Sequence, residues 1–150
     1  MDLSDELIIP APRDRVYAAL NDPEILRRCI PGCEELVKHS ETELEAKVVL
    51  KIGPVKARFS GKVTLNPENP PERFSLTGEG NGGVAGFAKG GSVVTLAEQG
   101  EETLLRYEAK AEIGGKLAQL GSRLIQGTAK KLAATFFDDF RAALTEEATA

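Results

Sequence analysis

The feature that most constrains the fold is a change of hydrophobic period along the chain. Between residues 42 and 65 apolar side chains alternate with charged or polar ones, and residues 103–113 repeat this alternation. After Gly114-Gly115 the apolar side chains recur every three or four residues. Alternation is typical of strands with one buried face, and the longer period is typical of an amphipathic helix. The sequence therefore predicts a sheet followed by one long helix.

The turns between the predicted strands are short. They lie at Gly53-Pro54, at residues 66–71 and within the glycine-rich segment 78–91. Short connections favour antiparallel neighbours, so the strands between Cys33 and Ile113 are expected to pair in sequence order. The long helix is expected over about residues 116–144, with a short polar tail at 145–150.

The N-terminal segment predicts one strand and two short helices. Leu3 to Ile9 is apolar enough for a strand, and helices are expected to begin near Pro12 and Pro23, since proline suits a first helical turn. Asp22 is the expected cap of the second helix. Residues 1–150 are thus expected to form a single α+β domain with a helix-grip fold. It consists of a curved seven-stranded antiparallel sheet wrapped on the C-terminal helix, with two short helices after strand 1.

Composition excludes several functional classes. The 150 residues hold 19 Lys or Arg against 23 Asp or Glu, a net charge of −4, which disfavours nucleic acid as a partner. Two Cys and one His are too few for an ordinary zinc site, so neither a metal nor a cofactor is expected. No apolar run approaches the 18 residues or so of a membrane span, and a cytoplasmic protein is expected.

Small residues at inward-facing strand positions predict a cavity. Ala46, Ala57, Gly61, Gly78 and Gly80 take such positions, and the sequence has no Trp to fill the space that they leave. Because interiors are normally filled to high density, we expect a cavity between the helix and the sheet that accepts an apolar ligand. Its expected lining is Phe59, Phe74, Leu76, Phe87, Tyr107, Leu120 and Leu124.

The two ends of the predicted sheet differ in chemistry. One end collects acidic turns, and the other collects apolar, glycine-rich turns where we expect the mouth of the cavity, at Gly53, Pro54, Gly82, Gly83, Gly86, Gly114 and Gly115. Four lysines flank that mouth: Lys51, Lys56, Lys89 and Lys116. An apolar lip with a cationic rim suits a membrane surface or the acidic patch of a partner protein.

Several local motifs resemble one family over essentially the whole chain. They are LNDP at 20–23, RRCIPGC at 27–33, KIGPV at 51–55, GEG with GG at 78–83, AGFAKG at 85–90 and GGKLAQLG at 114–121. The sequence is similar to the carbon monoxide dehydrogenase CoxG family, within the START/Bet v 1-like (SRPBCC) superfamily. The resemblance implies a non-catalytic accessory protein that recruits a molybdenum hydroxylase of the CO dehydrogenase type to the membrane and handles a quinone or lipid. Many members end in an apolar anchor, whereas residues 146–150 here are not apolar enough for one, so transient docking at the inner face of the membrane is expected.

Two other functions remain open from the sequence. A cyclase-like or hydrolase-like enzyme on the same fold needs an ionisable side chain that faces the cavity, and the alternation places none there. We therefore assign no catalytic residue. A pure docking or assembly factor would instead have a filled core. The glycines at 78, 80 and 83 match a phosphate-binding loop, but the expected strands on both sides favour a hairpin.

Overall fold

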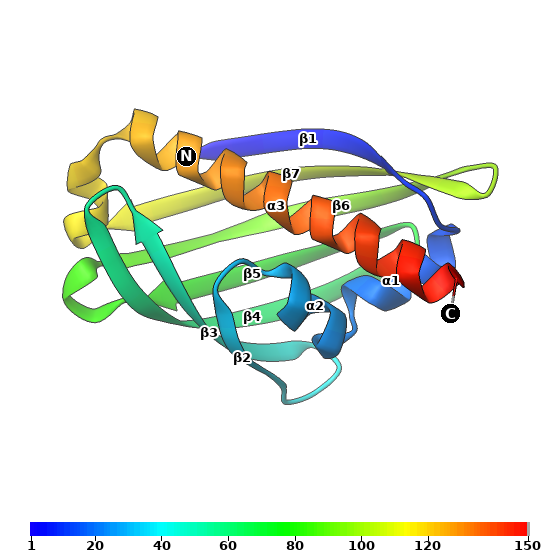
Figure 1. Ribbon diagram of the computed structural model, residues 1–150, viewed down its shortest axis with the longest axis horizontal. Coiled ribbons are helices and arrows are strands. Elements are labelled where there is room, and N and C mark those ends of the chain that lie inside the picture. Colours follow the sequence, from blue (N-terminus) through cyan, green and yellow to red (C-terminus); the bar gives the residue numbers. More distant parts are fainter. Residues whose placement is uncertain (150) are drawn as a thin grey trace.

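The computed structural model describes residues 1–149, and the side chains of residues 1–146. Seven strands form one antiparallel sheet in the order β1-β7-β6-β5-β4-β3-β2, which curves around the long helix α3 (Figure 1). The strands are β1 (Asp2–Ile9), β2 (Cys33–Lys38), β3 (Glu43–Ile52), β4 (Val55–Asn69), β5 (Arg73–Asn81), β6 (Phe87–Gln99) and β7 (Glu102–Gly114). The helices are α1 (Arg13–Leu20), α2 (Pro23–Cys29) and α3 (Ser122–Thr149), with 3₁₀ turns η1 (Gly83–Ala85) and η2 (Gly115–Leu120). The predicted helix-grip architecture is confirmed.

Local sequence signals account for the two short helices. Asp22 caps α2, since its side chain accepts a hydrogen bond from the backbone N–H of Glu24 at 2.9 Å, and Pro23 occupies the first turn. Pro12 precedes α1 with φ near −62°, the value that its ring imposes. The helix-start signals read from the sequence are therefore the ones that the fold uses.

The long helix begins later and ends later than the predicted range of 116–144. Residues 115–120 form the 3₁₀ turn η2, and Gly121 has φ +93°, a left-handed value that ends this turn before α3 starts. At its other end α3 continues to Thr149, so the predicted polar tail is helical up to that residue. Residue 150 lies outside the described residues.

The buried core fills one half of the space between the sheet and α3. It gathers where β1 ends and β7 begins, around Ile9, Leu105, Phe140 and Leu144, with α1 packed against it. A second cluster under α2 contains Leu26, Leu44 and Leu65. The rest of this core is Ala11, Val16, Ala19, Ile25, Cys29, Phe74, Val94, Leu96 and Ala143. These strand positions all lie near the turns β2–β3, β4–β5 and β6–β7.

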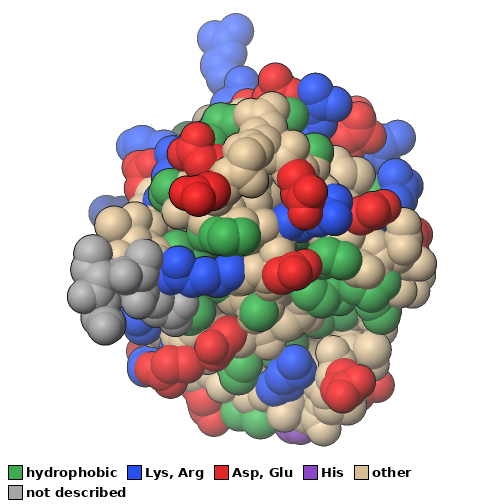
Figure 2. Space-filling view, turned by 90° about the vertical axis from the view of Figure 1, so that its right-hand side faces the viewer, with side chains coloured by type: hydrophobic (Ala, Val, Ile, Leu, Met, Phe, Trp, Pro, Cys, Tyr) green, Lys and Arg blue, Asp and Glu red, His purple; other side chains and the backbone are tan. Residues whose placement is uncertain are grey.

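Ion pairs close the end of the molecule that holds the core. Arg13 of α1 reaches Glu98 at 3.3 Å and Glu72 at 3.8 Å, and Arg28 of α2 bonds Glu146 of α3 at 2.9 Å. Figure 2 shows this end, where acidic and basic side chains lie interspersed with small hydrophobic areas. The expected acidic turns therefore meet at one end, where basic side chains of α1 and α2 balance part of their charge.

Candidate functional site

The opposite end of the molecule is built from three glycine-rich turns, and we call it the glycine-rich end. It consists of the β3–β4 turn at Gly53-Pro54, η1 with its flanking glycines, and η2 (Figure 1). The η1 turn is closed by a bond from the N–H of Gly82 to the carbonyl of Gly86, 2.8 Å long. A Cβ on Gly86 would lie 2.2 Å from the carbonyl oxygen of Gly114, and one on Gly53 would lie 2.8 Å from Leu124. The turns thus approach one another at distances that a side chain would prevent.

Behind these turns, part of the inner face of the sheet lacks any covering side chain. A Cβ on Gly80 would have no heavy atom within 4 Å. At Gly61 and Gly78 it would meet only atoms of the neighbouring strands, and none of α3. All three glycines are half-buried, and they take the inward positions that the alternation predicts. We call this region, between α3 and the inner face at Gly61, Gly78 and Gly80, the inner space.

Three of the seven predicted lining residues lie at the glycine-rich end. The Phe59 ring packs against Gly82, where a Cβ would come within 2.5 Å of it. Leu120 ends η2 and is half-buried, and Leu124, next to Gly53, is 39% exposed. These side chains keep much of their surface in contact with solvent, as an unfilled apolar site requires.

Three further predicted residues lie deeper, towards the core. Phe74 is buried and meets Tyr17 edge to face, with ring centroids 5.7 Å apart. Leu76 packs against both core clusters. Tyr107 is half-buried and stacks on Phe137 of α3, with ring centroids 5.5 Å apart. The rings of Phe74 and Tyr107 are therefore already engaged in packing.

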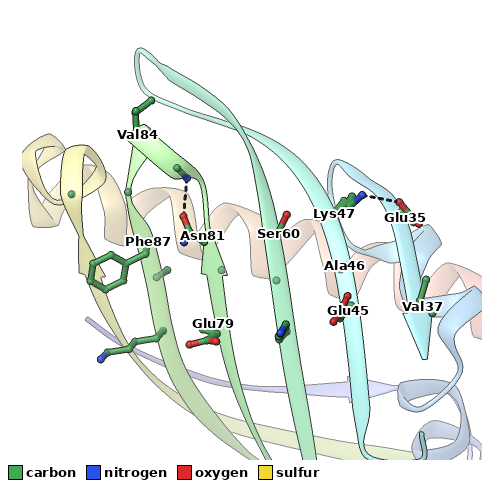
Figure 3. Close-up of a pocket in the computed structure, with 18 residues that line it drawn as sticks. Glu35, Val37, Glu45, Ala46, Lys47, Ser60, Glu79, Asn81, Val84 and Phe87 are labelled. Carbon is green, nitrogen blue, oxygen red and sulfur yellow. Dashed lines mark hydrogen bonds and ion pairs between the residues drawn. The ribbon is translucent and has the colours of Figure 1, made fainter. Parts of the chain in front are cut away.

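Phe87, the seventh predicted residue, lies on the outer face of the sheet. It pairs with Asn81 and Gly114, both at outward positions, and it is 41% exposed. There it borders a hollow of about 780 Å³ that crosses strands β2 to β6. Figure 3 shows this outer hollow with α3 behind the sheet. The strand β6 begins at Phe87, and its alternation turns this side chain away from α3.

One ionisable side chain faces the inner side, contrary to the prediction that none does. Asp5 of β1 lies directly opposite Tyr107 in the register, in an open groove of about 470 Å³ between β1 and α3. Burial raises the pKa of the Tyr107 phenol, and the carboxylate of Asp5 adds to the rise. Asp5 itself is exposed, because β1 is an edge strand. The parity analysis missed it because the apolar cluster at 7–9 dominated the N-terminal segment.

Three of the four predicted rim lysines lie within the turns of the glycine-rich end. Lys51 and Lys56 are opposite each other beside the Gly53-Pro54 turn, and Lys116 is exposed on η2. Lys89 instead points to the outer face, where its ammonium lies 3.5 Å from the carboxylate of Glu112. Like charges opposite each other on paired strands are unfavourable, so Lys51 and Lys56 are arranged for something other than stability.

The remaining chemistry-bearing residues serve the fold. Cys29 and Cys33 are free thiols, and burial raises the pKa of both. His39 is exposed, 3.5 Å from a carboxylate oxygen of Glu45. Among the described residues, no three His, Cys, Asp or Glu side chains gather as a metal site. The same residues include no helix that is both long and apolar enough to cross a bilayer.

The sheet curved around a C-terminal helix, with a core at one end and an inner space at the other, defines a helix-grip protein of the START/Bet v 1-like class. Within this class the chain belongs to the carbon monoxide dehydrogenase CoxG family, which residues 6–145 match. It is similar to the crystal structure of a conserved protein from Geobacillus kaustophilus, at 30% identity and a TM-score of 0.91 over 97% of this chain and 96% of that one.

Two more distant structures share the fold alone. A START superfamily protein from Mycobacterium smegmatis has 13% identity and a TM-score of 0.71, with 97% of each chain covered. The Zhui aromatase/cyclase from Streptomyces sp. R1128 has 9% identity and a TM-score of 0.69, with 95% of this chain and 92% of that one covered. No curated protein matches the sequence.

Proposed function

We propose that this protein binds an apolar ligand in the inner space and serves as a non-catalytic accessory protein of a molybdenum hydroxylase of the CO dehydrogenase type. The observation that carries the proposal is the empty surroundings of Gly80, where a Cβ would meet no heavy atom within 4 Å. Interiors are normally close-packed, so an apolar region left unfilled beside a formed core is the usual mark of a ligand site. Membership of the CoxG family supports the link to the enzyme.

The chemistry around the inner space favours a long apolar molecule with a polar end, such as a quinone or a lipid. Phe59, Leu76 and Leu124 offer partly exposed apolar surface beside the glycines. Tyr107 lies on the same inner face and carries a hydroxyl able to bond a ligand oxygen. In this proposal the apolar part of the ligand covers Gly61 and Gly80, and its polar end lies towards Tyr107.

The glycine-rich end is the proposed mouth, and its charge suits an anionic surface. Residues 48–60, 81–90 and 112–124 hold six Lys or Arg and a single acidic residue, although the whole chain carries −4. Those residues are Lys51, Lys56, Arg58, Lys89, Lys116, Arg123 and Glu112. Each cation near an anionic bilayer contributes about 1 kcal/mol. This end would therefore contact the membrane transiently and receive the ligand from it.

The test is to recover the ligand from the protein purified from cells. Native mass spectrometry before and after organic extraction should show a bound apolar molecule that extraction removes. Gly61→Phe, which places a ring in the inner space, should reduce its occupancy at least tenfold, while Gly100→Ala, in the distant β6–β7 turn, should leave occupancy unchanged. A protein that carries no apolar molecule and binds neither a quinone nor a lipid when either is supplied would refute the proposal.

A further inference from the structure

The outer hollow is separate from the inner space, because it lies on the other face of the sheet. The described residues include six large hydrophobic side chains that are exposed, and three of them border this hollow: Val37, Val84 and Phe87. Val84, on η1, is 86% exposed. The turn holds it firmly, since the side chain of Asn81 accepts a bond from the N–H of Gly83 at 2.8 Å. Figure 3 shows Val84 and Phe87 at one end of the hollow and Val37 at the other.

A row of alternating charges crosses the same hollow. Glu45, Lys62, Glu79 and Lys89 lie opposite one another in the register on the adjacent strands β3, β4, β5 and β6. We call this row the charge ladder. Its outer members have other partners, since Glu45 lies near His39 and Lys89 pairs with Glu112. For the central Lys62 and Glu79, the described part of the chain provides no ion pair within 4.0 Å.

The floor of the hollow allows a partner to come close to the backbone. Ala46, Gly61, Gly80 and Ala88 line it, and their strand positions direct any side chain to the inner face. A floor without side chains between walls of charge accommodates a convex object rather than a flat one. Large concave surfaces with exposed hydrophobic side chains at their ends are typical of protein interaction sites.

We propose that the outer hollow is the docking site for an α-helix of a partner protein, with charges of alternating sign one turn apart and a hydrophobic residue at one end. Neighbouring strands lie about 4.8 Å apart, close to the 5.4 Å rise of a helical turn, so each turn of a helix laid across the strands meets one member of the charge ladder. The helix presents basic residues to Glu45 and Glu79, acidic residues to Lys62 and Lys89, and its hydrophobic residue to Val84 and Phe87.

The chain's own exposed helix does not have this pattern. Lys131 and Asp138 of α3 are both exposed and lie two turns apart, with opposite charges. Members of the charge ladder that lie two strands apart carry the same charge. A second copy of this chain therefore mismatches the ladder, and the occupant is a different protein. The inference rests on the proposed function only in naming the molybdenum hydroxylase as the source of the helix.

The test uses two helix-stapled 16-residue peptides of identical composition. One carries Lys, Glu, Lys and Glu on successive turns and ends in Leu, and the other carries the same charges grouped as Lys, Lys, Glu, Glu. Titration of the ¹⁵N-labelled protein should shift the amide signals of Gly61, Gly80 and Val84. The alternating peptide should bind at least fivefold more tightly than the grouped one.

Exchanging the two central charges tests the ladder directly. The double variant Lys62→Glu/Glu79→Lys keeps the net charge and gives the order − − + +, so it should prefer the grouped peptide. The matched control is Glu6→Arg/Arg106→Glu, an ion pair of 2.7 Å at outward positions of β1 and β7, which should keep the original preference. Val84→Asp should weaken both peptides, and its melting temperature should stay within 2 °C because the side chain is exposed.

Equal binding of both peptides, binding of neither, or an unchanged preference in the exchanged variant would overturn the docking proposal. The Val84→Asp variant also separates this proposal from the proposed function. It should lose binding to the purified molybdenum hydroxylase while it retains the extractable apolar ligand. Enzyme binding that Val84→Asp and the charge exchange both leave intact would exclude the outer hollow as the docking site, whatever the fate of the ligand.

Discussion

Replacing Gly80 by leucine is expected to stabilise the protein and at the same time to abolish ligand binding. Gly80 lies inside β5 with an ordinary negative φ, and its missing Cβ would meet no heavy atom within 4 Å. Glycine inside a strand costs roughly 0.5–1 kcal/mol relative to alanine, and burying half of a leucine side chain adds about 1 kcal/mol. The free energy of unfolding should therefore rise by about 1–2 kcal/mol, which corresponds to about 2–8 °C in melting temperature for a chain of this size.

The matched control is Gly90→Ala on the adjacent strand. A Cβ there would lie 2.0 Å from the carbonyl oxygen of Lys110, so the backbone must shift and the melting temperature should fall. Differential scanning fluorimetry gives the two melting temperatures, and native mass spectrometry gives the ligand occupancy. If Gly80→Leu melts below the unsubstituted protein, as Gly90→Ala should, then side chains already fill the inner space. Retention of the ligand by a stabilised Gly80→Leu protein would show that the ligand lies elsewhere.

The remaining predictions concern the rim, a helix cap and two ionisable groups. Changing Lys51, Lys56 and Lys116 together to Glu should remove binding to phosphatidylglycerol vesicles in a co-sedimentation assay at low salt, and binding that ignores both salt and charge reversal would contradict the electrostatic account. Asp22→Ala should lower the free energy of unfolding by about 1 kcal/mol in a urea titration, because the N–H of Glu24 loses its cap. The raised pKa of Tyr107 means that stability is complete below the ordinary pKa of about 10 and is lost as pH rises through the higher folded value, so Tyr107→Phe should lessen the alkaline loss of stability in melts between pH 9 and 11. Cys33 should react with a thiol reagent in the native protein and Cys29 only after unfolding, as peptide mapping would reveal, since Cys29 is 1% exposed and Cys33 is half-buried.

The fold was predictable because its signals are local and periodic. The alternation from Leu44 to Leu65 assigns each side chain to a face, and the two-residue turn at Gly53-Pro54 leaves an antiparallel hairpin as the natural arrangement. Asp22-Pro23 marks a helix start with a cap and a first-turn proline. The start of α3 was less visible, since the apolar period runs unbroken from Leu117 to Leu124 and only the left-handed φ of Gly121 separates η2 from the helix.

The two faces of the sheet were harder to assign near the glycine-rich turn. Treating residues 81–87 as a turn left Phe87 without a parity, although extending the alternation of β6 back from Leu96 and Val94 points Phe87 outward. The charge ladder could not be found in this way. Alternation shows that Glu79 and Lys89 face the same side, but the register that puts them opposite each other depends on the geometry of the residues between Asn81 and Phe87.

Gly61 and Gly80 connect the two proposed sites, because they are opposite each other in the register and serve both faces of a sheet one layer thick. On the inner side their missing side chains leave room for a ligand, and on the outer side their backbone forms the floor of the outer hollow. The pleat directs any side chain added at either position to the inner side alone. Substitution at Gly80 therefore changes the ligand site and leaves the outer hollow open, whereas substitution at Val84 does the reverse. A protein that carries a ligand and also docks to an enzyme needs this independence, since one face can then exchange the ligand while the other stays bound.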